Sequence, residues 1–429
     1  MDEVRDEREE VDAQVPAAHP ERVFLDGFLP RTFAAFSHRN FRLYWFGNVI
    51  SLVGTWMQNI ATGWLVLQLT NSPFYVGLNS TLTWLPAWLV TLPAGVLADR
   101  FNKRNLMLIT QSLLAVFALV LAVLTWIHVI TITHMLIIAG LTGLVVTMNA
   151  PVFQAMVPEL VGHRDVLNAV ALNSASFNAA RIIGPSIAAV LLGTVGAGAC
   201  FGLNSLSFLA IIIPLFFIRL EPPRHHDTDE SAWQRMLYGL RFVRDHADIR
   251  TLVLMVAVYS SFGIIYLPLM PVFARDVYHA GAGGYGMLMS AIGVGAVAGG
   301  LFIATHSRTR YRGWILLVGT GLLALLLLGL SFARDLKLGM VLLVLIGFCQ
   351  TTISSLSNTL IQTLAPGHVR GRATSVFVLA FNGMFPLGSF AAGAIAQKYG
   401  APAATFAGGC VVLVSLAIFA SVRPQLRRL

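Results

Sequence analysis

The chain has 429 residues, of which 56% are hydrophobic and only 11% are charged, with a mean hydropathy of +0.73. Soluble domains carry about 25% charged residues, so this composition excludes an ordinary soluble protein. The formal net charge of +9 is divided among many short loops, and it therefore gives no indication of nucleic-acid binding.

The chain begins with a polar, acid-rich segment, residues 1–37, which opens with MDEVRDEREE. This segment lacks the apolar core of a cleavable signal peptide, and its composition is typical of a disordered tail. We predict a cytoplasmic N-terminal tail here and a short cytoplasmic C-terminal tail at residues 423–429.

About twelve apolar runs, each of about 20 residues, follow the tail. A helix rises about 1.5 Å per residue, so about 20 apolar residues cross the hydrocarbon core. Only helices and closed barrels satisfy their backbone hydrogen bonds in lipid, and runs this long are not barrel strands. We therefore predict an all-α membrane protein with twelve transmembrane helices in two six-helix bundles. The predicted spans are residues 41–69, 73–98, 105–127, 133–156, 166–195, 199–218, 249–275, 283–306, 313–333, 338–364, 372–397 and 402–422.

The longest internal polar stretch lies between the sixth and seventh spans. It divides the chain into a first bundle at residues 38–218, a linker at 219–250 and a second bundle at 251–422. Within the linker, WQRMLYGLRFVRDH predicts an amphipathic helix on the cytoplasmic membrane surface; a helix packed on the bundle is an equally good interpretation. The apolar face of this helix would hold Trp233, Met236, Leu237, Leu240 and Val243.

The two halves carry similar landmarks. Gln154-x-x-x-Pro158 ends the fourth span, and Gln362-x-x-x-Pro366 ends the tenth. Such parallel repeats are typical of transporters, whose substrate path lies between the halves. The basic residues are also asymmetric, because only Arg275, Arg334, Lys337 and Lys398 fall in loops on one side. By the positive-inside rule, both termini are predicted to be cytoplasmic.

The loop after the second span reads Gly95-Val-Leu-Ala-Asp99-Arg100-Phe-Asn102-Lys103-Arg104. It resembles the signature G-x-x-x-D-R-x-G-R-R of the major facilitator superfamily. The segments GTWMQ and LQLTNSP, with LNAVALNSASFNAARIIGP, look like its bacterial efflux branch, which includes enterobactin-exporter-like and macrolide-efflux-like proteins. The resemblance covers about residues 38–422 and implies a secondary active transporter that works by alternating access.

The resemblance also implies a conformational latch in this loop, made of Gly95, Asp99, Arg100 and Arg104. An acid at a facing helix N-terminus gains about 0.3–1 kcal/mol from the unsatisfied N–H groups there. The resemblance places that facing helix end at the start of the eleventh span, near residues 371–374. The alternative is a basic loop that only sets topology.

The fifth span holds a charge near the middle of the membrane, Arg181. Ser174, Asn178 and Pro185 share its helix face. An intramembrane arginine is expensive and points to function. Two interpretations stay open: Arg181 binds an anionic or carbonyl-rich substrate, or it makes a structural bond to carbonyls and Asn side chains. Gly184 and Pro185 resemble the antiporter element G-P-x-x-G-G and are predicted helix-packing positions, although alanines follow where that element has glycines.

Other spans carry polar and aromatic residues suited to a cavity for a bulky, partly apolar solute. Helix–helix hydrogen bonding is the competing explanation for each of them. The predicted substrate-binding set comprises Arg181, Asn178 and Ser174 together with Gln58, Asn59, Tyr259, Tyr266, Gln350 and Asn382.

The interiors of the spans contain no Asp or Glu, so proton coupling is implied by the resemblance and not by these residues. Cys200, Cys349 and Cys410 all lie in apolar runs and predict neither disulfides nor a metal site. No nucleotide-binding loop occurs, and no cofactor is expected.

Together, these features predict a monomeric exporter of the inner membrane for small amphipathic molecules, drug-like or siderophore-like. Its partners would be the substrate, the lipid bilayer and protons, with no nucleic acid. The alternatives are a metabolite importer of the same fold and a multi-span membrane enzyme or lipid-handling protein. The last alternative lacks a His, Asp or Ser constellation at a membrane face.

Overall fold

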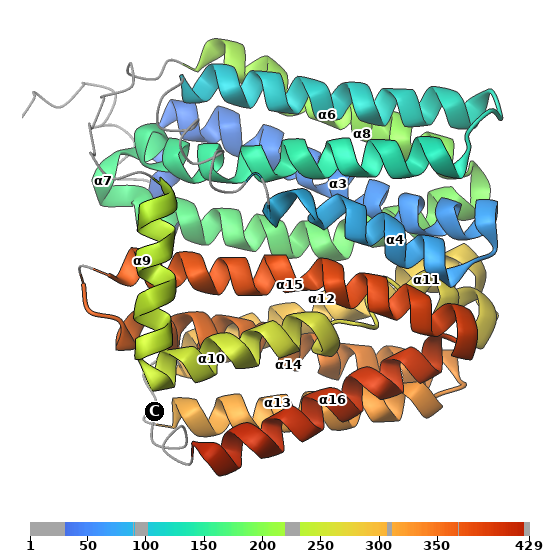
Figure 1. The fold of residues 1–429 in the computed structure, drawn as a ribbon. Helices are drawn as coiled ribbons and strands as arrows, with labels where there is room; N and C mark the ends of the chain where they lie inside the picture. The colour runs from blue at the N-terminus through green and yellow to red at the C-terminus, as the bar shows by residue number, and fades with distance from the viewer. Residues whose placement is uncertain are drawn as a thin grey trace, which may run out of the picture.

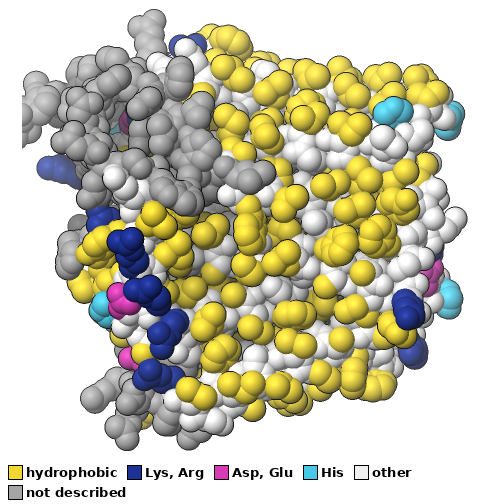
Figure 2. All heavy atoms as spheres, in the orientation of Figure 1, with side chains coloured by type: hydrophobic (Ala, Val, Ile, Leu, Met, Phe, Trp, Pro, Cys, Tyr) yellow, Lys and Arg dark blue, Asp and Glu magenta, His cyan; other side chains and the backbone are white. Residues whose placement is uncertain are grey.

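The structure is a computed structural model, and it describes residues 31–88, 90, 102–218, 232–306, 311–367 and 369–423. All regular secondary structure in these residues is helical. Nine helical segments among the described residues are long and apolar enough to cross a membrane, and two of them lie in one helix, α7. The spanning helices run side by side (Figure 1), and hydrophobic side chains cover the face seen in Figure 2 as a broad belt. The predicted all-α membrane fold is confirmed.

In the described residues of the first half, five α-helices follow a short 3₁₀ turn, η1 (Arg31–Ser37). They are α3 (Arg39–Thr70), α4 (Pro73–Trp84), α6 (Lys103–Trp126), α7 (Ile132–Thr194) and α8 (Ala197–Phe217). Helix α7 contains both the fourth and the fifth predicted spans, which meet at Gly162. Its φ of +68° is one that glycine adopts without steric cost. The second predicted span begins as α4, and most of its later part lies outside the described residues.

The second half begins with α9 (Ala232–Asp245), and its last five helices are long. These are α12 (Gly281–His306), α13 (Arg312–Phe332), α14 (Leu336–Leu364), α15 (Arg370–Tyr399) and α16 (Ala401–Val422). The end of the molecule at which α9 lies is called the linker end, and the opposite end, where α3 ends and α4 begins, the loop end (Figure 1). Short turns at the loop end use left-handed residues such as Asn71 (φ 51°) and His279 (φ 50°).

The seventh span is broken, so the predicted continuous helix at 249–275 is wrong. Helix α10 (Ala247–Val258) passes into a π-helical turn, η2 (Tyr259–Gly263), and regular helix returns only at α11 (Met270–Val272) and η3 (Phe273–Val277). Pro268 and Pro271 supply no backbone N–H to the interrupted segment. Single π-turns and broken spans are typical of functional sites in transporters.

Helix α9 packs on the bundle at the first turn of α15. A Cβ built on Gly239 would lie 3.0 Å from the carbonyl oxygen of Arg372, and the Arg372 guanidinium lies 4.5 Å from the ring centre of Tyr238. Val243 is buried, whereas Leu240 on the same predicted face is 39% exposed. The linker helix is therefore packed on the bundle along one side and open along another.

Candidate functional site

The centre of the interface between the halves is a contact between Arg181 of α7 and Gln350 of α14. The Arg181 guanidinium donates from Nη2 to Oε1 of Gln350 at 3.3 Å. The same guanidinium lies 5.9 Å from the ring centre of Trp56 on α3, in cation–π range. Among the described residues, no other protein acceptor lies within hydrogen-bond distance of Arg181. A guanidinium carries five N–H donors, so most of its donor capacity is unused by the protein.

Gln350 is held in place by two tyrosines from the broken seventh span. The Tyr266 hydroxyl donates to Oε1 of Gln350 at 3.3 Å, and the Tyr259 hydroxyl donates to its backbone carbonyl at 3.2 Å. Both rings are buried. Two residues of the broken span, seven positions apart, thus bond to Gln350, and their hydrogen bonds hold the residue that meets Arg181.

Gly184 and Pro185 lie where α7 passes between α3 and α12. A Cβ on Gly184 would lie 2.5 Å from the Cβ of Trp56, and a Cβ on Gly286 would lie 2.6 Å from the carbonyl oxygen of Pro185. The small residue at 184 therefore brings Trp56 close to Arg181. The pair that was predicted for helix packing stands at two close helix contacts.

Several predicted binding residues form bonds within their own helix or half. Ser174 Oγ donates to the carbonyl of Val170, and Asn178 Nδ2 donates to the carbonyl of Ser174. Oε1 of Gln58 accepts from Asn204 of α8 at 2.7 Å, inside the first half. The structure thus brings together Arg181, Gln350, Tyr259 and Tyr266. The side chains of Ser174, Asn178 and Gln58 bond elsewhere.

Asn59 and Asn382 occupy intermediate positions. Asn59 is exposed on α3, one turn before Gly63, whose built Cβ would lie 2.9 Å from the Tyr285 hydroxyl of the second half. Asn382 is half-buried on α15, next to Gly383. Both residues stay candidates for substrate contact.

Of the predicted latch, Gly95, Asp99 and Arg100 lie outside the described residues. Arg104 donates from Nε to the carbonyl of Leu215 at 2.6 Å and from Nη2 to that of Phe216 at 2.9 Å. These carbonyls end α8, so Arg104 caps a helix C-terminus within the first half.

Three tryptophans outside the predicted substrate-binding set make contacts at the site or between the halves. Trp56 lies beneath Arg181, Trp64 stacks with Tyr285 across the halves, and Trp88 donates from Nε1 to the carbonyl of Gly383. An aromatic residue within an apolar run has no distinctive pattern. The only available signal was the position of Trp56 beside the polar pair at 58 and 59.

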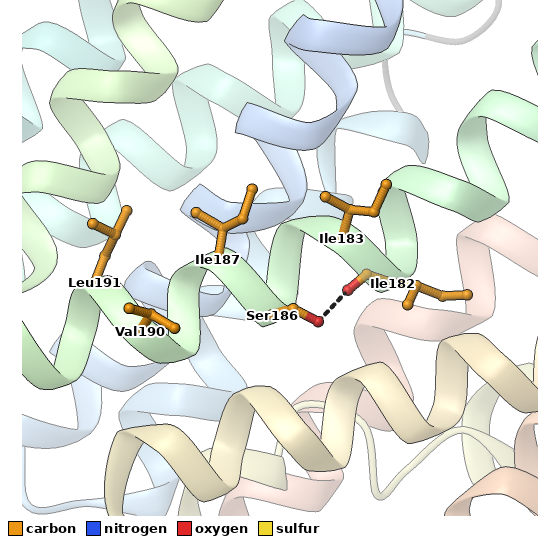
Figure 3. Close-up of a pocket in the computed structure, with 6 residues that line it drawn as sticks. All are labelled: Ile182, Ile183, Ser186, Ile187, Val190 and Leu191. Carbon is orange, nitrogen blue, oxygen red and sulfur yellow. Dashed lines mark hydrogen bonds between the residues drawn. The ribbon is translucent and has the colours of Figure 1, made fainter.

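A shallow hollow lies beside the site, on the outside of α7. It measures about 430 Å³ and is lined by Ile182, Ile183, Ser186, Ile187, Val190 and Leu191. Figure 3 shows that all six side chains come from one helix, with Ser186 hydrogen-bonded to the Ile182 carbonyl. Five of its six lining residues are aliphatic, and the one hydroxyl, of Ser186, already donates to Ile182, so Arg181 and Gln350 are the better candidates for polar recognition.

The helical fold in two halves is the fold of the major facilitator superfamily of transporters. Solved structures that share the fold include nucleoside transporter NupG, with a TM-score of 0.71 and 12% identity over 92% of this chain and 99% of that one. A bacterial homologue of the human lysosomal transporter Spinster, in an inward-facing, occupied conformation, has a TM-score of 0.71 and 12% identity over 91% of this chain and 98% of that one. A D-xylose–proton symporter has a TM-score of 0.69 and 13% identity over 90% of this chain and 96% of that one. A family model described as "Transmembrane secretion effector" matches residues 30–428, and the chain belongs to this family. It is thus a multi-pass membrane transporter of small molecules and not an enzyme.

Sequence relatives have transport functions of their own. The chain is 28% identical to "Multidrug efflux pump Tap" of Mycolicibacterium fortuitum, over 86% of this chain and 92% of that protein. It is 26% identical to "Staphyloferrin A transporter" of Staphylococcus aureus, over 83% and 90%. It is 25% identical to "Enterobactin exporter EntS" of Citrobacter koseri, over 80% and 81%.

Proposed function

We propose that this chain exports small, partly apolar molecules that carry anionic or carbonyl-rich groups. The observation that supports this proposal is the Arg181 guanidinium, held midway along a span between the halves with most of its donors unused. The drug and siderophore exporters among its relatives support the direction of transport.

The chemistry of the centre favours acceptors over donors in the substrate. Arg181 can only donate, and Gln350 already offers its carbonyl oxygen to Arg181 and Tyr266, which leaves its amide N–H₂ group for a ligand. A carboxylate or a pair of carbonyls can accept two parallel bonds from a guanidinium, which a lysine cannot offer in the same geometry. Trp56, which lies against the Arg181 guanidinium, adds apolar surface for the remainder of the molecule.

The proposed setting is the inner membrane, with both termini and the 219–250 linker in the cytoplasm, as the charge asymmetry predicts. The bundles at 38–218 and 251–422 rock about the central contact in an alternating-access cycle. Proton coupling and a monomeric state belong to the proposal through family resemblance, and so does the latch at Asp99. Impermeant labelling at Asn71 and His279, but not at Arg308, is the expected topology result.

The test is substrate binding and export by Arg181 variants. Arg181→Ala is expected to reduce affinity for a fluorescent carboxylate by about tenfold or more, because a charged hydrogen bond contributes about 1.5–3 kcal/mol. Arg181→Lys should keep part of the affinity, and Asn178→Ala, whose side chain bonds its own helix, should lose little. Affinity is measured on purified variants of matched thermal stability, and export as uptake into inside-out vesicles.

The methyl ester of the same probe is the chemical control, since it keeps the apolar body and loses the charge. Equal affinity of wild type and Arg181→Ala for the carboxylate would assign Arg181 to structure. Uptake into right-side-out vesicles only would support import instead.

A further inference from the structure

The exposed side of α9 is a second surface with a defined chemistry. Figure 1 shows α9 crossing the linker ends of the spanning helices instead of running beside them. A helix in this position lies along the membrane boundary, where amphipathic helices contact headgroups and the start of the acyl chains.

Basic side chains gather on and around this helix. Arg241 and Arg244 are exposed one turn apart on α9. Exposed Arg250 lies in the first turn of the neighbouring helix α10, and exposed Arg370 begins α15. Asp245 offsets part of this charge, because it pairs with Arg244 at 3.0 Å. Figure 2 shows the Lys and Arg side chains at this end as a column along the border of the hydrophobic belt.

Apolar side chains are exposed among these bases. Tyr238 is 45% exposed and Leu240 is 39% exposed, and both lie within one turn of Arg241. A soluble anion would be bound by the arginines alone and would gain nothing from the exposed leucine and tyrosine beside them. A surface that meets both phosphates and acyl chains uses both kinds of residue.

Helix α9 is also coupled to the transport machinery. Its Gly239 packs on the carbonyl of Arg372, and its Tyr238 ring faces the Arg372 guanidinium, both at the first turn of α15. Helix α15 then runs to the loop end, where Gln397 contacts Ser72 of the first half. A ligand that holds α9 in place therefore also holds the first turn of α15, a helix that runs along the interface to the loop end.

We propose that the exposed side of α9 binds the headgroups of anionic phospholipids in the adjoining leaflet. Phosphate oxygens accept hydrogen bonds from Arg241 and Arg244, while Leu240 and the Tyr238 ring enter the boundary with the acyl chains. By holding α9, these lipids stabilise the linker end of α15. The inference is independent of the direction of transport and of the substrate.

The test uses the full chain in nanodiscs of phosphatidylcholine, alone or mixed with phosphatidylglycerol. The number of phosphatidylglycerol molecules retained in native mass spectrometry and the rise in Tm with phosphatidylglycerol are both measured. Arg241→Gln with Arg244→Gln is expected to weaken phosphatidylglycerol binding by about tenfold, since each base near an anionic surface contributes about fivefold and Arg244 is partly neutralised.

Two control pairs make the result decisive. Lys337→Gln with Lys398→Gln removes two exposed bases at the loop end and is expected to keep the wild-type lipid dependence. Arg241→Lys with Arg244→Lys keeps the charge and should keep most of the binding, which shows that folding is intact.

Three results overturn the proposal. The first is unchanged phosphatidylglycerol binding in the glutamine pair. The second is an equal loss in the loop-end pair, which means a general effect of net charge. The third is the same rise in Tm from soluble glycerol phosphate, which means a site for free phosphate and not for lipid.

Discussion

In the residues that the structure describes, the loop end and the centre of the interface between the halves are joined by different kinds of contact. The hydrogen bonds between the halves in the described residues run from the loop end to the middle of the spans, where Arg181 and Trp88 lie. Toward the linker end of α7, Ser174 and Asn178 bond only to α7 itself. Among the described residues, the halves are thus joined from the loop end to the central level of Arg181.

The joined region at the loop end, here called the loop-end seal, combines a rigid contact with two exchangeable ones. Gly77 of α4 and Gly393 of α15 meet backbone to backbone. Arg275 caps the end of α3 through the Leu67 carbonyl and the Asn71 side chain, and Gln397 caps the start of α4. Helix-end groups can exchange protein partners for water, so these caps open at a small net cost.

The difference between the loop-end seal and the central contact indicates which contacts determine the conformational equilibrium. The seal consists of glycine packing and exposed caps that are individually weak, whereas the central Arg181–Gln350 contact is half-buried and charged. We infer that a substrate accepting bonds from Arg181 acts on this central contact between the halves and that the seal then opens at low cost.

The largest effect is expected from a methyl group inside the glycine contact. In Gly77→Ala the new Cβ would lie 2.7 Å from the Cα of Gly393, and overpacking of this kind costs about 1–3 kcal/mol. Because the clash exists only while the loop end is sealed, the sealed population should fall about tenfold or more, and transport should fall with it. Spin-label distances between Gln68→Cys and Lys398→Cys, in a background without the three native cysteines, measure the opening.

Gly140→Ala is the matched control for this variant. Gly140 is also a glycine in a membrane helix, yet a Cβ there meets nothing within 4 Å. Unchanged distances in Gly77→Ala, or equal changes in both variants, would show that the glycine contact does not determine closure.

A smaller effect is expected at the cap of α3. Arg275→Ala removes donors from the Asn71 side chain at 2.8 Å and from the Leu67 carbonyl at 3.3 Å. A cation at a helix C-terminus contributes about 0.3–1 kcal/mol, so the ratio of sealed to open molecules should fall up to about fivefold. The control is Arg334→Ala, an exposed arginine at the same end with no inter-half hydrogen bond among the described residues. The same spin labels report both, and an equal shift in the control contradicts a specific role for Arg275.

The long helices could be predicted from the sequence more completely than the break in the seventh span, for a physical reason. Burial in lipid acts on whole segments, so the positions of the long helices and the mid-span charge of Arg181 were accessible from hydropathy alone. The break in the seventh span had a local signal in Gly263, Pro268 and Pro271, but membrane helices tolerate such residues, and the signal is ambiguous without the packing.

Partner choice between helices could not be predicted. Arg181 and Gln350 are 169 positions apart, and whether they meet depends on helix rotation and depth to within a fraction of a turn. The same uncertainty explains Gln58, which turned toward Asn204 and not toward the interface. Polar residues on membrane helices bond wherever the nearest partner lies, and a one-residue change of register gives a different partner.

The smallest effect is expected at the cap of α4, where two substitutions should shift the sealed population in opposite directions. Oε1 of Gln397 accepts from the Ser72 hydroxyl at 2.6 Å and from the backbone N–H of Phe74 at 3.4 Å, at the N-terminus of α4. Gln397→Ala removes both bonds from an exposed site, so the sealed population should fall about twofold, which corresponds to about 0.5 kcal/mol. Gln397→Glu keeps the acceptor and places a negative charge at a helix N-terminus, where anions gain about 0.3–1 kcal/mol. It should therefore raise the sealed population above that of wild type. The measurement is the spin-label distance distribution of the two variants side by side, with labels at Gln68→Cys and His279→Cys. A shift in the same direction for Ala and Glu would mean that Gln397 acts by its shape alone and that the cap of α4 is no part of the seal.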